Sequence, residues 1–286
     1  MIYVSAEEWY SSNRKSVLIF GMSGLGKTRL SKMLRKSAHW FHYSIDYRIG
    51  TRYMGEYIAD NALSEAMKQP FLRDMLLTDS ISIKSNLSFD NLTPVSAYIG
   101  KPGNPILGGL KIDEYKRRQE QFKRAEIQAL LDTPHFIQRA ELIYGYTHFV
   151  CDTGGSICEW VDPNNPSDEI LSKLSKHMLL IWLKEDPEHI AELIKRFDRK
   201  PKPMAYQPAF LERVWKEYLS EQQCKENDVN PDNFIRWTYS RALAHRQPRY
   251  EKMAKWGITI NAKNIHDCED EAKFVEIVFE AIKSKK

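Results

Sequence analysis

The chain has 286 residues, of which 42% are hydrophobic and 28% are charged. This is an ordinary globular composition, long enough for one enlarged domain or two and apolar enough for a buried core. The formal net charge of +4 is too small and too dispersed to indicate nucleic-acid binding by itself, although a modestly basic chain suits anions such as nucleoside triphosphates.

Residues 21–28 read GMSGLGKT and fit the pattern G-x-x-x-x-G-K-[ST] without departure. An apolar run at 16–20 predicts a buried strand before this segment, and apolar residues at helical spacing over 29–36 predict a helix after it. A strand, a glycine turn and a helix start direct backbone N–H groups and the helix dipole at one small volume, which attracts phosphate. We therefore predict that nucleotide is bound by Gly21, Ser23, Gly24, Leu25, Gly26, Lys27 and Thr28.

Two side chains of this phosphate loop have specific expected roles. The ammonium group of Lys27 can reach the β- and γ-phosphates, and the hydroxyl of Thr28 can ligate Mg²⁺. ATP and Mg²⁺ are therefore the expected cofactors.

Aromatic and β-branched residues over 40–46 predict a second strand, which ends at Asp46. Ligands of open α/β sheets bind just outside the carboxyl ends of the strands, so Asp46 is placed to contact a ligand. A helix-capping role for Asp46 before the next helix is the alternative, and the two roles are compatible.

The sequence becomes irregular over 53–114, with a helical stretch at 57–77 and then segments rich in Ser, Asn, Pro and Gly. A segment of this length between core elements is typical of a substrate-facing insertion or a mobile loop, and the sequence does not decide between them. A long charged helix is predicted over 112–132. Its cations are explained mainly by a solvated helix face.

A further apolar run ends at Asp152 and fits the hhhhD pattern of a second nucleotide-site motif, whose carboxylate holds Mg²⁺ directly or through water. Gly154 and Gly155 would let a substrate approach the backbone at the end of this strand. Ser156 can donate a hydrogen bond there or cap the next helix.

The last part of the chain predicts a strand at 178–183, a helix from 187 to 197, and a cationic, proline-containing segment at 198–203. That segment suits a lid over phosphates and equally an ordinary solvated turn. Two helices over 209–245, a strand at 257–261 and a helix over 269–283 follow. Alternating strands and helices predict an α/β fold in one domain over 1–286, with a parallel sheet covered on both faces.

The cysteines and the N-terminal sequence indicate where in the cell the protein is expected. The four cysteines lack the paired spacing of metal ligands, so we predict reduced thiols rather than a zinc site or a disulfide framework. The first residues lack the basic and apolar regions of a signal peptide, and no apolar run approaches about 18 residues. We expect a soluble cytoplasmic protein without membrane association.

Taken in order along the chain, several of these stretches resemble the shikimate kinase group of P-loop small-molecule kinases. The phosphate loop matches, and Asp46 stands about where that family keeps an Asp that binds the substrate hydroxyl. Residues 152–156 resemble its Gly-Gly-Gly substrate loop, with Ser156 in place of the third glycine. Residues 199–201 fall at its Arg-Pro lid motif, and residues 246–250 resemble its R-x-P-x-Y stretch.

The resemblance implies a three-layer α/β sandwich of the shikimate and nucleoside-monophosphate kinase type, with helical insertions and an enlarged helical lid over 199–245. It implies that Arg199 closes on the transferred phosphate and that Arg246 binds an anionic group of the acceptor. Arg124, in a loose echo of the family's Phe-Arg-x-x-Glu helix, is a candidate for a second such contact. Asn261 is similar in position to the element that leads to the adenine-contacting loop.

The departures from the family pattern also carry information. Ser44 stands where the family has a carboxylate linked to Mg²⁺, and Asp152 would have to supply that group. The insertions near 53–114 and 204–245 make the chain longer than that family, so we do not expect shikimate itself to be the acceptor.

The expected function is an ATP-dependent phosphotransferase that moves the γ-phosphate to a hydroxyl of an anionic small molecule. The alternative is an ATPase that acts as a nucleotide-gated regulatory or binding protein, with a protein partner at the insertions. We do not expect a nucleic-acid partner, because no continuous basic and aromatic surface is evident. The predicted roles are catalysis by Lys27, Asp46 and Arg199, acceptor binding by Asp46, Arg124, Gly154, Gly155 and Arg246, and metal binding by Thr28 and Asp152.

Overall fold

Five parallel strands form the centre of the structure, a computed structural model that describes residues 2–285. The strands lie in the order β2-β3-β1-β4-β5, and each neighbouring pair is parallel. They are β1 (Ser16–Phe20), β2 (Trp40–Ser44), β3 (His148–Asp152), β4 (Leu179–Lys184) and β5 (Ile258–Asn261). The predicted parallel sheet is confirmed.

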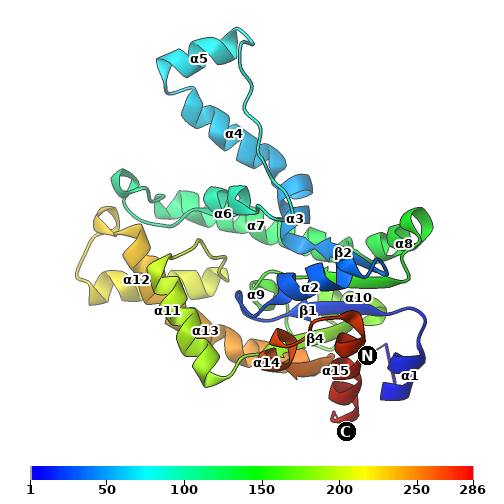
Figure 1. Cartoon of the computed structure of the whole chain (residues 1–286). Coiled ribbons are helices and arrows are strands. Elements are labelled where there is room, and N and C mark those ends of the chain that lie inside the picture. Colours follow the sequence, from blue (N-terminus) through cyan, green and yellow to red (C-terminus); the bar gives the residue numbers. More distant parts are fainter. Residues whose placement is uncertain (1, 286) are drawn as a thin grey trace.

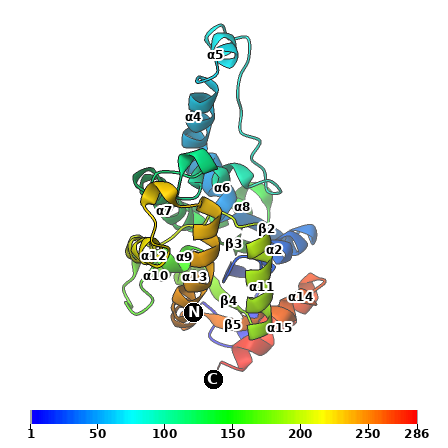
Figure 2. The ribbon, with the colours of Figure 1, turned by 90° about the vertical axis from the view of Figure 1, so that its left-hand side faces the viewer.

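Helices cover both faces of this sheet, which makes three layers (Figure 2). On one face lie α2 (Lys27–Lys36) and α15 (Glu271–Lys283), with α1 (Ala6–Ser11) packed against α15. On the other face lie α8 (Thr133–Tyr144), α10 (Glu169–His177) and α13 (Pro231–Ala254). Because both faces are covered, the central strands are continuous apolar runs rather than alternating ones, and Val17, Leu18, Ile19 and Phe20 of β1 are buried.

A short helical element or a helix start follows each strand at one edge of the sheet. After β1 comes α2, and after the other four strands come α3 (Ile45–Arg48), which continues into the π-helical turn η1 (Ile49–Tyr53), then α9 (Ile157–Trp160), α11 (Pro187–Arg199) and α14 (Ala262–His266). Since all strands run in the same direction, their carboxyl ends share this edge, where open α/β sheets bind their ligands.

The segment predicted as an insertion contains an arm that projects from the body of the molecule (Figure 1). The arm consists of α4 (Gly55–Ala66) and α5 (Pro70–Leu77), and the chain returns to the body through α6 (Thr93–Ile99), the 3₁₀ turn η2 (Pro105–Leu107) and α7 (Ile112–Leu131). The predicted single helix over 57–77 is wrong, because the helix ends after Ala66 and a new one begins at Pro70. Proline has no N–H to continue a helix and is favoured at a first helical position.

The region before β5 is also helical. It holds α12 (Pro208–Glu221), the 3₁₀ turn η3 (Glu226–Asp228) and α13. The second predicted helix was expected to end near residue 245, but α13 continues to Ala254 with Pro248 inside it. Side-chain hydrogen bonds from Arg246, Arg249 and Tyr250 to the segment after β3 hold this part of α13 in place, which offsets the backbone hydrogen bond that Pro248 removes.

No helix within residues 2–285 combines the length and the apolar character needed to cross a lipid bilayer.

Candidate functional site

A cavity of about 310 Å³ opens at the carboxyl edge of the sheet. Three stretches that are distant in sequence line it: the phosphate loop, the start of α3 and the loop after β3. The lining residues are Ser23, Gly24, Gly26, Lys27, Thr28, Arg29, Asp46, Thr153, Gly154 and Gly155. The structure therefore brings most of the residues predicted for the phosphate and acceptor sites together in one pocket, and adds Arg29 and Thr153, for which no role was predicted.

The phosphate loop has the backbone that its glycines predict. Gly24 and Gly26 have φ values of 97° and 89°, and Gly26 begins α2 without any side chain capping the helix. The first N–H groups of α2 are thus left for a ligand, as in phosphate-binding helix starts. A Cβ on Gly24 would lie 2.7 Å from Cδ2 of Leu193, so α11 rests directly on the loop. The side chain of Leu25 is buried in the core, so the predicted contact of Leu25 with nucleotide could come from its backbone alone.

The Lys27 side chain is buried in the wall of the pocket. Its Nζ donates hydrogen bonds of 2.8 Å each to the carbonyl oxygens of Gly21 and Met22. Burial lowers the pKa of this ammonium group, and the carboxylates of Asp152 and Asp46 oppose that effect. The cation is therefore held against its own loop, within the field of two acidic side chains.

Asp46 is the second residue of α3, in the first turn of that helix. The cap itself is Ser44, whose Oγ accepts a 3.3 Å hydrogen bond from the Tyr47 N–H. The alternative that Asp46 caps the helix is therefore wrong, and its carboxyl group lines the cavity instead. Burial and, to a lesser degree, the nearby Asp152 carboxylate raise the pKa of Asp46 to about 6, against the opposing charge of Lys27.

Asp152 is the last residue of β3, and it pairs in register with Ser44 of β2 and Ile19 of β1. It is only 5% exposed, and its Oδ2 lies 3.6 Å from Nε2 of the buried His42. An acidic oxygen at a strand end, with the Thr28 hydroxyl on the pocket wall, fits the oxygen ligands that Mg²⁺ takes together with substrate phosphates. No group of three His, Cys, Asp or Glu residues in the described chain is arranged to hold a metal alone, so the donor set fits the ion only with phosphate oxygens added.

The loop after β3 contacts the phosphate loop because its glycines have no side chains. A Cβ on Gly155 would lie 3.2 Å from the backbone nitrogen of Ser23. A Cβ on Gly154 would lie 3.1 Å from Oδ1 of Asp46 and 3.4 Å from Oε1 of Glu126. Larger residues at these two positions would push apart the segments that form the pocket.

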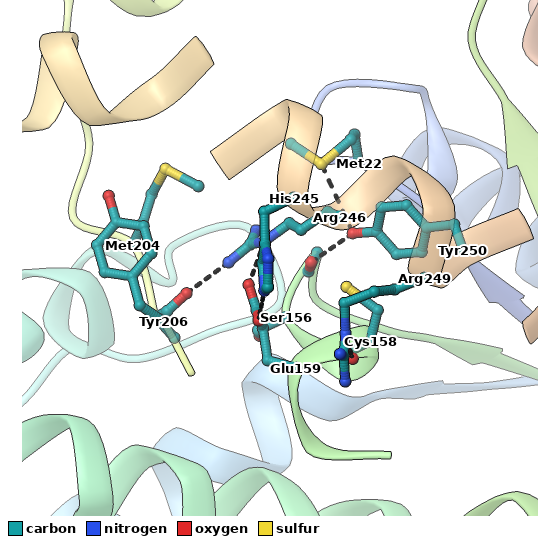
Figure 3. A network of polar contacts seen from close by, with 12 residues as sticks. Met22, Ser156, Cys158, Glu159, Met204, Tyr206, His245, Arg246, Arg249 and Tyr250 are labelled. Carbon is teal, nitrogen blue, oxygen red and sulfur yellow. Dashed lines mark hydrogen bonds and ion pairs between the residues drawn. The ribbon is translucent and has the colours of Figure 1, made fainter. Parts of the chain in front are cut away.

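Arg246 approaches the pocket from α13, in a network shown in Figure 3. Its Nε donates to Oε1 of Glu159 at 2.7 Å, and its Nη2 donates to the carbonyl of Ala205. Burial alone would raise the pKa of Glu159, but the guanidinium charge and the adjacent His245 outweigh it and lower that pKa. Within the described chain Nη1 of Arg246 makes no hydrogen bond, and it lies 3.7 Å from the position of a Cβ on Gly155. One nitrogen of Arg246 is therefore turned to the edge of the pocket.

The other predicted cations are placed differently. The Arg124 side chain is 77% exposed and pairs with Glu120 at 3.0 Å, so the structure does not bring it to the pocket. Arg199 is the exposed last residue of α11 and does not line the cavity. Its role as a lid residue stays a prediction.

Asn261 ends β5, and its side chain accepts a hydrogen bond from the Lys263 N–H, which caps α14. This gives Asn261 a structural role at the ligand-binding edge of the sheet. Its predicted place beside the adenine stays a prediction.

Sequence reasoning missed two buried carboxyl groups next to the pocket, those of Glu126 and Glu159. Glu126 lies on α7, where its Oε2 accepts hydrogen bonds from Ser156 Oγ at 2.5 Å and Trp160 Nε1 at 2.6 Å. Burial raises the pKa of Glu126 to about 7 in spite of these two donors. Glu126 is the last residue of the stretch 122–126 that resembles Phe-Arg-x-x-Glu. That resemblance could have identified Glu126 as a site residue, but it led to the prediction of an acceptor contact for Arg124 instead.

Comparisons with known proteins add little to this geometry. No protein-family description matches the chain, and no curated protein matches it either. Among solved structures, the crystal structure of shikimate kinase from Bacteroides thetaiotaomicron is similar over 94% of this chain and 97% of its own, at 16% identity and a TM-score of 0.39. A similarity of this strength leaves the function to be argued from the site.

Proposed function

We propose that this protein transfers the γ-phosphate of ATP to a hydroxyl group of a small molecule. The observation that carries the proposal is the presence of Lys27 and Asp46 at one pocket of about 310 Å³. A phosphate-binding loop alone would serve any ATPase. A carboxyl group opposite the phosphate loop adds a group that can orient an acceptor hydroxyl and accept its proton.

In this proposal the protein acts mainly by positioning the reactants, because phosphoryl transfer needs little covalent chemistry from the enzyme. The backbone amides of residues 24–28 and the Lys27 ammonium group hold the β- and γ-phosphates. To reach them, Lys27 exchanges its hydrogen bonds with the carbonyls of Gly21 and Met22 for bonds to phosphate oxygens. Asp46 orients the acceptor hydroxyl in line with the γ-phosphorus and accepts its proton as the new bond to phosphorus forms, while the bond from the γ-phosphorus to the bridging oxygen breaks and ADP leaves.

Thr28 and Asp152 are the residues that would hold Mg²⁺ beside the phosphates. When bound, the ion supplies positive charge that neutralises the phosphate oxygens. Asp152 is suited to this task because it is nearly buried at the end of β3, where its position is fixed by the strand.

We further propose that Arg246 contacts the acceptor through Nη1, the nitrogen that faces Gly155. This supports the expectation of an acceptor with an anionic oxygen, but with one guanidinium nitrogen instead of a bidentate clamp. Arg199 would close over the transferred phosphate after movement of α11. All four cysteines are free, in keeping with the cytoplasmic location that we propose.

The test is a coupled assay of ADP release with hydroxylated acids, sugars and nucleosides, compared with an acceptor-free control. Release that depends on the acceptor, with a phosphorylated product detected by mass spectrometry, would support the proposal. ADP release at the same rate without any acceptor would overturn it in favour of an ATPase that acts as a nucleotide-gated binding protein. Binding to a random oligonucleotide at several salt concentrations would test the exclusion of a nucleic-acid substrate.

A further inference from the structure

A second carboxyl group stands behind the pocket wall at Gly154. The Glu126 side chain is fully buried, yet within the described chain its Oε1 has no hydrogen-bond partner. A buried polar oxygen without a partner costs free energy, and native proteins seldom leave one. Such an oxygen next to a ligand pocket is therefore suited to accept a hydrogen bond from a ligand.

The direction of this oxygen is fixed by its neighbours. The other oxygen, Oε2, accepts hydrogen bonds from both Ser156 Oγ and Trp160 Nε1. The carboxyl group cannot turn Oε1 toward another partner without losing these two bonds. Oε1 thus stays directed at the space beside Gly154, where a Cβ would lie 3.4 Å from it.

Asp46 is directed at the same space. Its Oδ1 lies 3.1 Å from the point that a Cβ on Gly154 would occupy, and Gly154 itself lines the cavity. The Asp46 carboxylate also raises the pKa of Glu126, which reflects how close the two acidic groups are. A molecule seated against Gly154 therefore meets the Asp46 carboxyl group, and Oε1 of Glu126 lies directly behind the same part of the wall.

We infer that Glu126 and Asp46 jointly select an acceptor with two neighbouring hydrogen-bond donors, such as a vicinal diol or a hydroxyl group beside an amine. This inference rests on the proposed phosphotransferase function and names its substrate class. When both groups are ionised, above about pH 7 for Glu126, their oxygens only accept hydrogen bonds, so a pair of donors complements them and a second carbonyl or carboxylate at that place is repelled. Arg246, already paired with Glu159, leaves room for an acceptor oxygen only on the side of Gly155.

The test compares acceptors that differ by one donor. D-glycerate, D-gluconate, D-glucuronate and D-glucosaminate, which combine neighbouring donors with an anionic group, are each assayed beside the deoxy analogue that lacks one neighbouring donor. The wild-type protein should prefer the complete acceptor by about ten- to hundredfold in kcat/KM, the range expected for one hydrogen bond to a charged group. Glu126→Gln should abolish most of this preference, because the amide oxygen accepts the hydrogen bonds from Ser156 and Trp160 and the NH₂ group, a donor, is then turned to the acceptor.

Two further variants separate recognition from a structural effect. Trp160→Phe removes one donor from Oε2 and leaves Oε1 unchanged, so it should affect the complete acceptor and its analogue equally. Gly154→Ala should raise the acceptor KM at least tenfold while the ATP Kd changes less than threefold, because its Cβ fills the space between the two carboxyl groups. If Glu126→Gln does not fold, the Gly154→Ala measurement and the wild-type preference between acceptors still test the inference.

Several outcomes would overturn the inference. A wild-type protein that phosphorylates a complete acceptor and its analogue equally well would refute it while leaving the proposed function intact. Equal losses for both molecules in Glu126→Gln, as in Trp160→Phe, would reduce Glu126 to a structural residue. ATP hydrolysis that no acceptor stimulates would remove the proposed function, and the inference with it.

Discussion

Arg246 and Glu159 form an ion pair in which Nε lies 2.7 Å from Oε1, with side chains that are only 4% and 0% exposed. This pair joins α13 to α9, the short helix after the loop that carries Gly154 and Gly155. It fixes the guanidinium group at the edge of the pocket. The position of Nη1, the nitrogen that we propose contacts the acceptor, therefore depends on Glu159.

The first prediction follows from this burial. Glu159→Ala leaves the Arg246 charge buried and unpaired, so we expect the free energy of unfolding to fall by about 3–5 kcal/mol. The matched control is Glu141→Ala, which breaks the exposed pair with Arg14 and should cost about 1 kcal/mol or less. Urea denaturation of both variants measures the difference. Equal losses would mean that the buried pair contributes no more than a surface contact.

Lys27→Ala should abolish ATP turnover, with a loss of about a hundredfold or more, while the protein stays folded. Among the described residues the lysine Nζ donates to carbonyls of its own loop, so its removal breaks no hydrogen bond between elements. Steady-state ADP release and a circular-dichroism melt provide the measurements, with the surface variant Lys32→Ala as control. Full activity of Lys27→Ala would refute the assignment of the phosphate loop.

Asp46→Asn should remove phosphoryl transfer to the acceptor and retain ATP binding. The amide keeps the size of the side chain and loses the charge that accepts the proton. Isothermal titration with a non-hydrolysable ATP analogue, beside the coupled assay, separates the two effects. If nucleotide binding fails to the same degree as transfer, Asp46 belongs to the metal site or to the fold.

Asp152→Asn should weaken binding of ATP in the presence of Mg²⁺ far more than binding of ATP alone. The carboxylate at the end of β3 is the acidic oxygen that we assign to the ion, and an amide is a poorer ligand for a hard cation. Titrations with and without EDTA give the two affinities, and Asp46→Asn is the comparison. An equal loss under both conditions would mean that Asp152 does not act through a metal.

The pKa of Asp46, raised to about 6 by burial, predicts two pH effects. Activity should fall below about pH 6, because the base must be ionised. The carboxyl group of the unfolded chain titrates near pH 4, so the folded state binds the proton more tightly. The resulting stabilisation is complete below about pH 4 and is lost as the pH rises through about 6.

Asp46→Asn should therefore flatten the pH dependence of stability. Relative to this variant, wild-type protein should lose about 2–3 kcal/mol of unfolding free energy between pH 4 and pH 7. Urea denaturation at the two pH values measures the change. A wild-type protein that instead gains stability relative to the variant over this interval would show that the Asp46 pKa is lowered by folding.

The helix α7 shows where sequence reasoning reached its limit. The residues of 112–131 predicted a long helix correctly, yet they did not reveal which side of it faces the pocket. Arg124 and Glu126 are two residues apart, which is about 200° around a helix. Placing one of them in solvent therefore directs the other inward, and the packing of α7 against α3, η1 and α10 decides which one it is.

What the sequence determined by itself was local in the chain. It determined the phosphate loop, the strand that precedes it, the place of Asp152 at the end of a strand, and the alternation of strands and helices that produces a parallel sheet. These features depend on neighbouring residues, since backbone freedom and hydrophobic periodicity act over a few positions. Only the tertiary structure decided that Arg246 pairs with Glu159, 87 residues earlier, and that Glu126 stands beside Gly154. Such contacts arise from the way whole helices pack in the folded protein. The spacing of side chains along one segment does not predict them.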